Sequence, residues 1–441
     1  MSSYAAKVIS VTQALSFVKS GDVIVTGLAA AEARAFLGEL HTIAHRVSNV
    51  SVTTCLPMQA AEYFMNPAYS ESFRMAGWFY TGPMRKMHSQ GHISFIPNHL
   101  HLASSKRLTH VRPQIFVGTA TRPDKHGYIS LSLSNVYEKA MLTSADLVII
   151  EVNPKLPRTF GDCEVHMDDV DYFIEVDYDV PQLPDANSSD KDLAIGQYIA
   201  SMVNDGDCLQ LGIGSIPNAV AVSLLAKKDL GIHTEMLTTG LMRLIKAGAV
   251  TNKRKVLYPG KSVCCFALGT RDLYDFIDDN PSVLVLDGRY VNDPAVIGQN
   301  DNQVSINTTL EIDLTGQCCS ESIGHMQYSG TGGQTDTAVG AQRAKNGRSF
   351  IALYSTTQVV NRETGKNEEI SKIVAMLKPG AIVSLSRNDV DYVVTEYGIA
   401  ALRGTDVPER VGRMIAIAHP DFRTQLLAEA QNLGYIARGR V

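Results

Sequence analysis

Residues 210–236 constrain the fold more than any other part of the sequence. They begin within a short apolar run, Cys208–Leu211, which is followed by two glycines and then by an apolar segment at helical spacing. That order is typical of a strand, a tight turn and a helix, and Pro217 suits the first turn of such a helix. A glycine turn that leads into a helix points several backbone N–H groups at one place, where the helix dipole adds partial positive charge. We therefore expect an anion or a developing oxyanion to bind at the turn that contains Gly212 and Gly214.

A second apolar run, residues 230–234, delivers a single carboxylate, that of Glu235. If the two strands are parallel neighbours, Glu235 lies beside the glycine turn. In one mechanism the turn binds the pyrophosphate of a dinucleotide and Glu235 binds a ribose hydroxyl, although Pro217 stands where that fingerprint needs a third small residue. In another, Glu235 is a nucleophile that attacks a thioester carbonyl while backbone amides stabilise the negative charge. A plain turn and a surface glutamate are the third possibility.

Length and composition limit the classes to which the protein can belong. With 441 residues, 45% of them hydrophobic and 19% charged, the chain can form a large core and is expected to fold as two domains. The formal net charge of −5 provides no basic surface for nucleic acid. No window approaches the roughly 20 apolar residues of a membrane helix, and no secretory signal is visible, so no membrane association is expected. Seven cysteines, an odd number with two adjacent pairs, do not suggest a disulfide framework, and we expect a cytoplasmic protein.

Two pairs of similar segments suggest that the chain has two halves with related folds. FVKSGDVIVTGL at residues 17–28 resembles MVNDGDCLQLGI at 202–213, and SADLVIIEVN at 144–153 resembles DVDYVVTEYG at 389–398. The copies are separated by residues 177–192, which contain two prolines and many small polar or charged residues. We therefore expect an N-terminal α/β domain over residues 1–184 and a C-terminal α/β domain, carrying Glu235, over residues 185–441.

Alternating strand and helix patterns predict an α/β fold with two related, open and mostly parallel sheets. In the first half, buried strands are expected at residues 23–25, 50–54, 115–117, 129–133 and 147–152, with helices at 33–41 and 136–142 among others. Residues 74–101 are rich in glycine, methionine, histidine and aromatics, and we expect this segment to face a substrate. Its histidines lack the pattern of a helical zinc site, so we expect no metal at His88, His92, His99 or His101.

Three further features lie in the second half. Asn292 precedes a turn at Asp293 and Pro294, and its amide could either donate to a carbonyl oxygen or cap its own turn. Glu396, at the end of an apolar run, is a rival to Glu235 for the role of nucleophile. The run YSGTGGQTD, residues 328–336, would let a ligand approach the backbone at three glycines, Gly330, Gly332 and Gly333.

These motifs resemble those of the acetyl-CoA hydrolase/transferase family, a branch of the class I CoA-transferases, and especially its 4-hydroxybutyrate and butyrate:acetate CoA-transferases. The resemblance is carried by LQLGIGSIPNAV, LGIHTEM, YVNDPAVIGQND, YSGTGGQTD and DVDYVVTEYGIAALRG, and it covers nearly the whole chain, including EVNPKLPRTFGD and IAHPDF. It implies that Glu235 is the catalytic glutamate and that residues 212–217 form a turn that contacts CoA. It also implies that Gly332 and Gly333 belong to the CoA and oxyanion region and that Asn292 polarises a carbonyl.

The implied chemistry is a ping-pong exchange. Glu235 attacks an acyl-CoA to give a mixed anhydride, the CoA thiolate then forms a glutamyl-CoA thioester, and a second carboxylate reverses both steps. Each intermediate keeps the activation of a thioester, so neither ATP, a metal nor a tightly bound cofactor is expected, and CoA is a substrate. Binding of the distant parts of CoA can lower the barrier at the reacting carbonyl.

The sequence departs from the family pattern after Asp336. Relatives commonly have Phe-x-Arg there, whereas this chain has Thr337, Ala338 and Val339, which leaves the acid open among butyrate, 4-hydroxybutyrate, acetate and a small dicarboxylate such as succinate or itaconate. The alternatives are an acyl-CoA hydrolase, a dinucleotide-dependent oxidoreductase and a noncatalytic CoA-binding protein. The resemblance also implies a homodimer or a higher homo-oligomer.

Overall fold

The first half of the chain builds the larger of two main sheets. The computed structural model describes residues 4–361 and 364–437. Its largest sheet has seven strands, all parallel to their neighbours. In spatial order they are β10 (Tyr172–Glu175), β7 (Leu147–Val152), β5 (Ile115–Ala120), β1 (Val23–Thr26), β2 (Val50–Thr54), β3 (Phe73–Gly77) and β4 (Ile93–Phe95).

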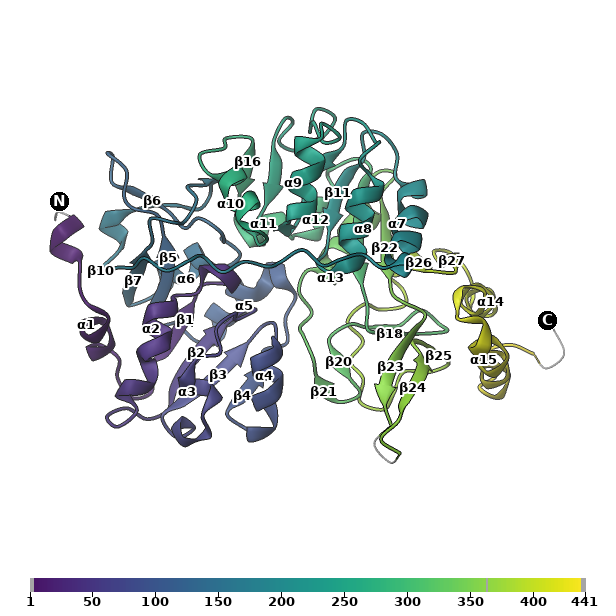
Figure 1. Ribbon diagram of the computed structural model, residues 1–441, viewed down its shortest axis with the longest axis horizontal. Helices are drawn as coiled ribbons and strands as arrows, with labels where there is room; N and C mark the ends of the chain where they lie inside the picture. The colour runs from purple at the N-terminus through teal and green to yellow at the C-terminus, as the bar shows by residue number, and fades with distance from the viewer. Residues whose placement is uncertain (1–3, 362–363, 438–441) are drawn as a thin grey trace.

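Both faces of this sheet are buried, which explains its nearly continuous apolar strands. Along β5, Ile115 and Val117 lie in one hydrophobic cluster and Phe116 lies in another, because successive side chains point to opposite faces. The first cluster includes residues of α1 (Val11–Ser16) and α2 (Arg34–Glu39), and the second includes residues of α6 (Glu138–Ser144). This half is the purple-to-blue part of the ribbon in Figure 1.

The second half builds a six-stranded sheet that is parallel except for its last strand. In spatial order the strands are β12 (Gly231–Ile232), β11 (Cys208–Leu211), β17 (Gln303–Thr308), β22 (Arg348–Ala352), β26 (Tyr392–Thr395) and the antiparallel β27 (Gly398–Ala401). Along β22, Phe350 shares a cluster with α8 (Ser215–Ser223), and Ile351 shares another with α13 (Gln334–Arg343). Helices therefore cover both faces of this sheet too.

Smaller sheets join the two halves. β8 (Phe160–Gly161), from the first half, is the edge strand of a parallel sheet with β16 (Val283–Val285) and β14 (Ser262–Cys264). β13 (Met236–Leu237) pairs with β15 (Phe266–Ala267), directly after Glu235. Residues 176–189 have no regular secondary structure and cross the front of the molecule to α7 (Asp190–Met202) (Figure 1).

Further elements surround these sheets. The other helices are α3 (Glu62–Met65), α4 (Gly82–Met87), α5 (Ala103–His110), α9 (Thr239–Lys246), α10 (Arg271–Ile277), α11 (Gly288–Val291), α12 (Pro294–Ile297), α14 (Val407–Ile417) and α15 (Pro420–Asn432). The other strands are β6 (Tyr128–Ser130), β9 (Glu164–His166), β18 (Glu311–Asp313), β19 (Cys318–Cys319), β20 (Ser322–Ile323), β21 (Met326–Gln327), β23 (Thr356–Val360), β24 (Asn367–Ser371) and β25 (Ile373–Val374).

The predicted fold class is confirmed, since both main sheets are open and mostly parallel. The strand predicted at residues 129–133 is wrong: only β6 forms, and it pairs antiparallel with β9 outside the main sheet. Ser132 has φ = 65°, a left-handed conformation that cannot continue a strand. The first pair of similar segments forms β1 and β11, which hold the same place in their own sheets: each lies between the next strand of the chain and a later one. The second pair forms β7 and β26, which hold different places, since β7 lies two strands from β1 and β26 lies three strands from β11.

Two expectations from composition concern disulfide bonds and membrane helices. All seven cysteines are buried and free. In the part of the chain that the structure describes, no helix combines the length and the apolar character that crossing a membrane requires.

Candidate active site

Glu235 leaves the six-stranded sheet beside the glycine turn, as the sequence predicted. β12 pairs in parallel with β11, with Gly231 opposite Cys208 and Ile232 opposite Leu209, so both strands end at the same edge. The main chain of Glu235 is then fixed by its carbonyl oxygen, which accepts hydrogen bonds from the N–H groups of Cys265 and Phe266 at 3.0 and 3.2 Å. The Glu235 side chain therefore projects from a short, hydrogen-bonded segment between β12, which pairs with β11, and β13, which pairs with β15.

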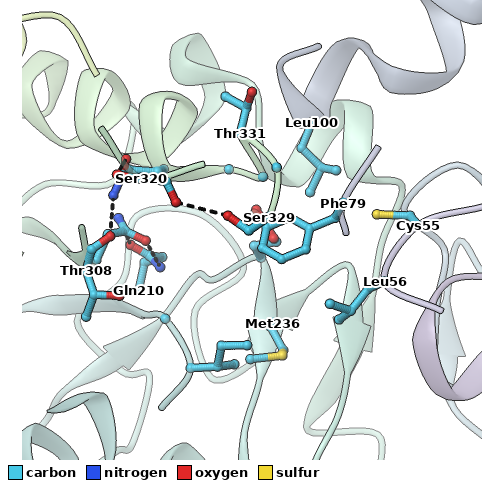
Figure 2. A pocket seen from close by; sticks show the side chains of 18 of the residues that line it. Cys55, Leu56, Phe79, Leu100, Gln210, Met236, Thr308, Ser320, Ser329 and Thr331 are labelled. Carbon is cyan, nitrogen blue, oxygen red and sulfur yellow. Dashed lines mark hydrogen bonds between the residues drawn. The ribbon is translucent and has the colours of Figure 1, made fainter. Parts of the chain in front are cut away.

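A cavity of about 280 Å³ opens over Glu235. Figure 2 shows its two unlike sides, with Cys55, Leu56, Phe79 and Leu100 on one and Gln210, Thr308 and Ser320 on the other. These four apolar residues come from the first half of the chain and the three polar ones from the second, which also adds apolar lining at Met236, Phe266 and Leu310. The cavity also brings in four of the predicted glycines and one predicted neighbour, namely Gly212, Ile213, Gly330, Gly332 and Gly333.

The Glu235 carboxylate is enclosed by Asn292 and Gly333. Asn292 Nδ2 donates a hydrogen bond of 2.6 Å to Glu235 Oε2, and the backbone N–H of Gly333 also donates to this carboxylate. A Cβ atom on residue 333 would lie 1.8 Å from Glu235 Oε2 and 2.4 Å from Asn292 Nδ2. Only glycine fits at this position, because its backbone must come as close to the carboxylate as a hydrogen bond allows.

The environment raises the pKa of Glu235 to about 7. Burial is the largest cause, since it disfavours the charged form, and the negative charge of Asp336 adds to it. The hydrogen bonds from Asn292 and Gly333 act in the opposite direction by stabilising the carboxylate. Near neutral pH the group is therefore partly ionised and more basic than an ordinary glutamate.

Asn292 is held for this contact by its neighbours and not by its own turn. Asp293 caps α12 through its side chain, which accepts a hydrogen bond from the Ala295 N–H, so the amide of Asn292 is not needed there. The Asn292 side chain is fully buried, and the preceding residue, Val291, accepts a hydrogen bond of 2.9 Å from His233 Nε2. The structure therefore excludes the role of a cap for its own turn and shows the Asn292 amide donating to the Glu235 carboxylate, while donation to a carbonyl oxygen stays a prediction.

The predicted CoA turn divides between two cavities. Ile213 lines both the cavity over Glu235 and a smaller one of about 160 Å³, which Gly214 also lines. Gly214 has φ = 114° at the start of α8, a conformation that favours glycine. Ser215 instead bonds its hydroxyl to that of Tyr354 at 2.9 Å, and Ile216 is buried, and neither lines these two cavities.

The loop at residues 328–333 packs directly on the first half of the chain. A Cβ atom on Gly330 would lie 2.3 Å from the carbonyl oxygen of Trp78, so the two backbones touch. The Tyr80 N–H donates to the Ser329 carbonyl oxygen at 3.2 Å. Gly332 has φ = 53°, which turns the loop toward Gly333. Glycines in this run therefore serve the contact between the halves as well as the contact with Glu235.

The segment predicted to face a substrate, residues 74–101, contributes Phe79 and Leu100 to the cavity. Its histidines have other partners: His88 bonds Tyr80, His92 bonds the Phe64 carbonyl oxygen and His101 bonds Asp336. No group of three or more His, Cys, Asp or Glu residues suited to a metal ion occurs among the described residues.

Sequence reasoning missed the rest of the apolar lining from the first half of the chain, namely Leu28, Cys55 and Leu56. They follow buried strands and look like ordinary core residues, so no sequence signal separates them from the core.

Glu396 occupies a different environment from Glu235. It lies between β26 and β27, accepts hydrogen bonds from the Ser355 N–H and hydroxyl at 2.9 and 2.8 Å, and pairs with Lys191 at 3.2 Å. It is not among the residues that line the cavity over Glu235. Burial alone would raise the pKa of Glu396, but these contacts outweigh it and lower the pKa. Of the two candidate glutamates, Glu235 therefore lines the cavity and has the raised pKa.

The residues that depart from the family pattern lie in α13, behind the cavity. Thr337 is buried, and its hydroxyl accepts hydrogen bonds of 3.0 Å from the Ser305 hydroxyl and from Asn307 Nδ2. Asn307 itself lines the cavity, whereas Thr337 does not. Thr337 therefore contacts the polar side of the cavity through the amide of Asn307.

Known proteins resemble this chain over most of its length. The model of the acetyl-CoA hydrolase/transferase N-terminal domain matches residues 1–184, and that of the C-terminal domain matches residues 269–430. A succinyl-CoA:cyclohexane-1-carboxylate CoA transferase of Geobacter metallireducens is 43% identical, over 98% of this chain and 97% of its own. A 4-hydroxybutyrate coenzyme A transferase of Clostridium kluyveri is 40% identical, over 97% of each chain. The crystal structure of RipA from Yersinia pestis superposes with a TM-score of 0.92 at 35% identity, covering 98% of this chain and 99% of that one.

Proposed function

The chain belongs to the acetyl-CoA hydrolase/transferase family, and from this premise we propose that it is a CoA-transferase that moves CoA between an acyl-CoA and a short-chain carboxylic acid. The observation that carries the proposal is the enclosure of the Glu235 carboxylate by Asn292 and Gly333 at the base of a cavity with one apolar side. A carboxylate held in this way suits a nucleophile better than a ligand for ribose, since its oxygen is already bonded to protein donors.

In the proposed first step, a Glu235 oxygen attacks the thioester carbonyl and the carbon–sulfur bond breaks. CoA leaves as a thiolate, and the acyl group remains on Glu235 as a mixed anhydride. The raised pKa of Glu235 increases the basicity of the attacking oxygen while leaving part of it ionised at neutral pH. Atoms and electrons balance without a proton transfer, a metal or a redox step.

In the second step, the CoA thiolate attacks the carbonyl carbon of Glu235 and expels the acid. The oxyanion that develops now belongs to Glu235, and Asn292 Nδ2 and the Gly333 N–H already point at its oxygen. Donors that are in place before charge develops lower the barrier without reorganising. The glutamyl-CoA thioester is then consumed by a second carboxylic acid in the reverse of the two steps.

The apolar side of the cavity favours an acyl group with an apolar tail, of which butyrate is the simplest of the candidate acids. We further propose a cytoplasmic homo-oligomer with domains over residues 1–184 and 185–441 and with no tightly bound cofactor. Support for the compartment comes from the seven free, buried cysteines, which suit a reducing environment, and for the division from the irregular segment at residues 176–189.

Mass spectrometry after incubation with butyryl-CoA and then borohydride tests the nucleophile. We expect a reduced side chain at Glu235 in the wild type and in Glu396→Gln, and none in Glu235→Gln. Modification at Glu396 instead would refute the assignment. Turnover that depends on added acetate supports a transferase, whereas equal turnover without an acceptor would identify a hydrolase.

A further inference from the structure

A histidine from the first half of the chain bonds the helix that encloses Glu235. His101 lies in a short 3₁₀ turn (Leu100–Leu102), and its Nδ1 is 2.8 Å from Asp336 Oδ1. Its backbone N–H donates to the other oxygen of the same carboxylate at 3.1 Å. The Asp336 side chain is 2% exposed and that of His101 is 18% exposed. A carboxylate only accepts hydrogen bonds, so His101 Nδ1 carries the proton in this contact.

Asp336 is linked to Glu235 through the start of α13. It is the third residue of that helix, and Gly333, whose N–H bonds Glu235, immediately precedes the helix. The charge of Asp336 acts on Glu235 in the same direction as burial. Among the described neighbours of Glu235, Cys55 and Cys265 are buried thiols, and Asp336 is the one that carries a charge.

Several groups set the charge of His101. Burial alone would lower its pKa, but the hydrogen bond to Asp336 and the charges of Asp336 and Asp293 outweigh burial and the repulsion by Lys106, so the pKa is raised. His99 lies close by, with Nδ1 at 3.9 Å from Asp336 Oδ1 and a ring stacked on that of His101. Its side chain is 44% exposed, so it is the weaker partner of Asp336.

We propose that His101 is a positioning residue for the reaction at Glu235: it fixes Asp336 at the start of α13 and offsets the charge that Asp336 directs at the nucleophile. The catalytic part of this inference rests on the proposed function. When His101 is protonated, it forms an ion pair with Asp336, and ionising Glu235 costs less free energy. When His101 is neutral, Glu235 ionises beside an uncompensated negative charge. The first half of the chain then controls the nucleophile that the second half carries.

Two substitutions of opposite electrostatic effect test the proposal. His101→Gln keeps an N–H donor for Asp336 but cannot become charged, and Asp336→Asn removes the negative charge at nearly constant size. We expect the pKa of Glu235 to rise in His101→Gln and to fall in Asp336→Asn, each by about one unit. The double variant should match Asp336→Asn alone, because His101 acts through Asp336.

The pKa of Glu235 can be measured with and without turnover. Carbon-13 NMR of glutamate labelled at the carboxyl group reports it directly, and the resonance is assigned by its loss in Glu235→Gln. The acidic limb of kcat/KM for butyryl-CoA reports the same ionisation in the free enzyme. His99→Gln is the matched control, and we expect less than half of the shift seen in His101→Gln.

A purely structural role for His101 predicts a different pattern. Both variants would then lower the melting temperature and leave the Glu235 pKa unmoved, or move it in the same direction, and either result would overturn the proposal. If His101→Gln does not fold, the pKa of His101 is measured instead, from its ring resonances in the wild type and in Asp336→Asn. A pKa of His101 that is no lower in Asp336→Asn would also overturn the proposal. Opposite shifts in a protein that exchanges no CoA would leave the electrostatic coupling standing and remove the proposed function.

Discussion

Replacing Gly333 with alanine tests whether the contact between Glu235 and the residue that precedes α13 is required for catalysis. An alanine Cβ would lie 1.8 Å from Glu235 Oε2, where ordinary contact begins at 3.4 Å, so the oxygen has to move by about 1.6 Å. Gly333 has φ = −98°, within the range that alanine adopts, so the substitution changes space and not backbone conformation. A misplacement of about 1 Å at a reacting group can cost roughly 100-fold in rate, and we expect kcat to fall at least that far.

The assay is single-turnover formation of the glutamyl-CoA thioester from butyryl-CoA, followed by mass spectrometry. We expect the free energy of unfolding to fall by about 1–3 kcal/mol, because the added methyl group overpacks a buried site and moves the Glu235 oxygen away from its donors. Gly412→Ala is the control: it lies within α14, its Cβ would meet nothing within 4 Å, and it should keep the wild-type rate while gaining about 0.5–1 kcal/mol of stability. A Gly333→Ala enzyme that forms the thioester within about threefold of the wild-type rate would refute the reasoning, since the predicted misplacement costs far more.

Two other substitutions give results of different kinds. Phe79→Ala enlarges the apolar side of the cavity, and we expect kcat/KM for butyryl-CoA to fall about tenfold relative to that for acetyl-CoA, which has no apolar tail to lose these contacts. An unchanged ratio would mean that the acyl group binds elsewhere. Lys255 is 7% exposed, donates to the carbonyl oxygens of Ile232 and Lys261 at 2.6 and 2.7 Å, and has its pKa lowered by burial from 10.5 to about 8. The unfolded chain holds this proton up to a higher pH, so the stability of the wild type relative to Lys255→Met should rise by up to about 3 kcal/mol between pH 8 and 10.5. A difference in the free energy of unfolding, measured by urea denaturation, that stays constant across this window would contradict the prediction.

Local patterns account for the part of the site that could be predicted from the sequence. The parallel placement of Glu235 beside Gly212 follows from two short apolar runs, each of which ends at a glycine or a carboxylate. The glycines at 330, 332 and 333 were predicted to let a ligand approach the backbone. The structure adds that Gly330 and Gly333 are also required by protein atoms, the Trp78 carbonyl oxygen and the Glu235 carboxylate.

Contacts between the two halves could not be predicted in the same way. His101 and Asp336 are 235 residues apart, and neither stands in a pattern that indicates the other. Cys55 and Leu56 directly follow a buried strand, and an apolar residue at such a place looks the same whether it faces the core or a cavity. The error at residues 129–133 has a local cause, since nothing in that apolar run marks Ser132 as left-handed.

The loop at residues 328–333 lies between the apolar wall of the cavity and Glu235, and under the proposed function this position couples the fit of the acyl group to the placement of the carboxylate. On one side its backbone touches Trp78 and Tyr80, next to Phe79 on the apolar wall. On the other side Gly333 touches Glu235. An acyl group that displaces Phe79 must therefore press on the same short loop that holds the carboxylate in place, and because close-packed groups shift together, a poorly fitting acid should lose rate as well as affinity.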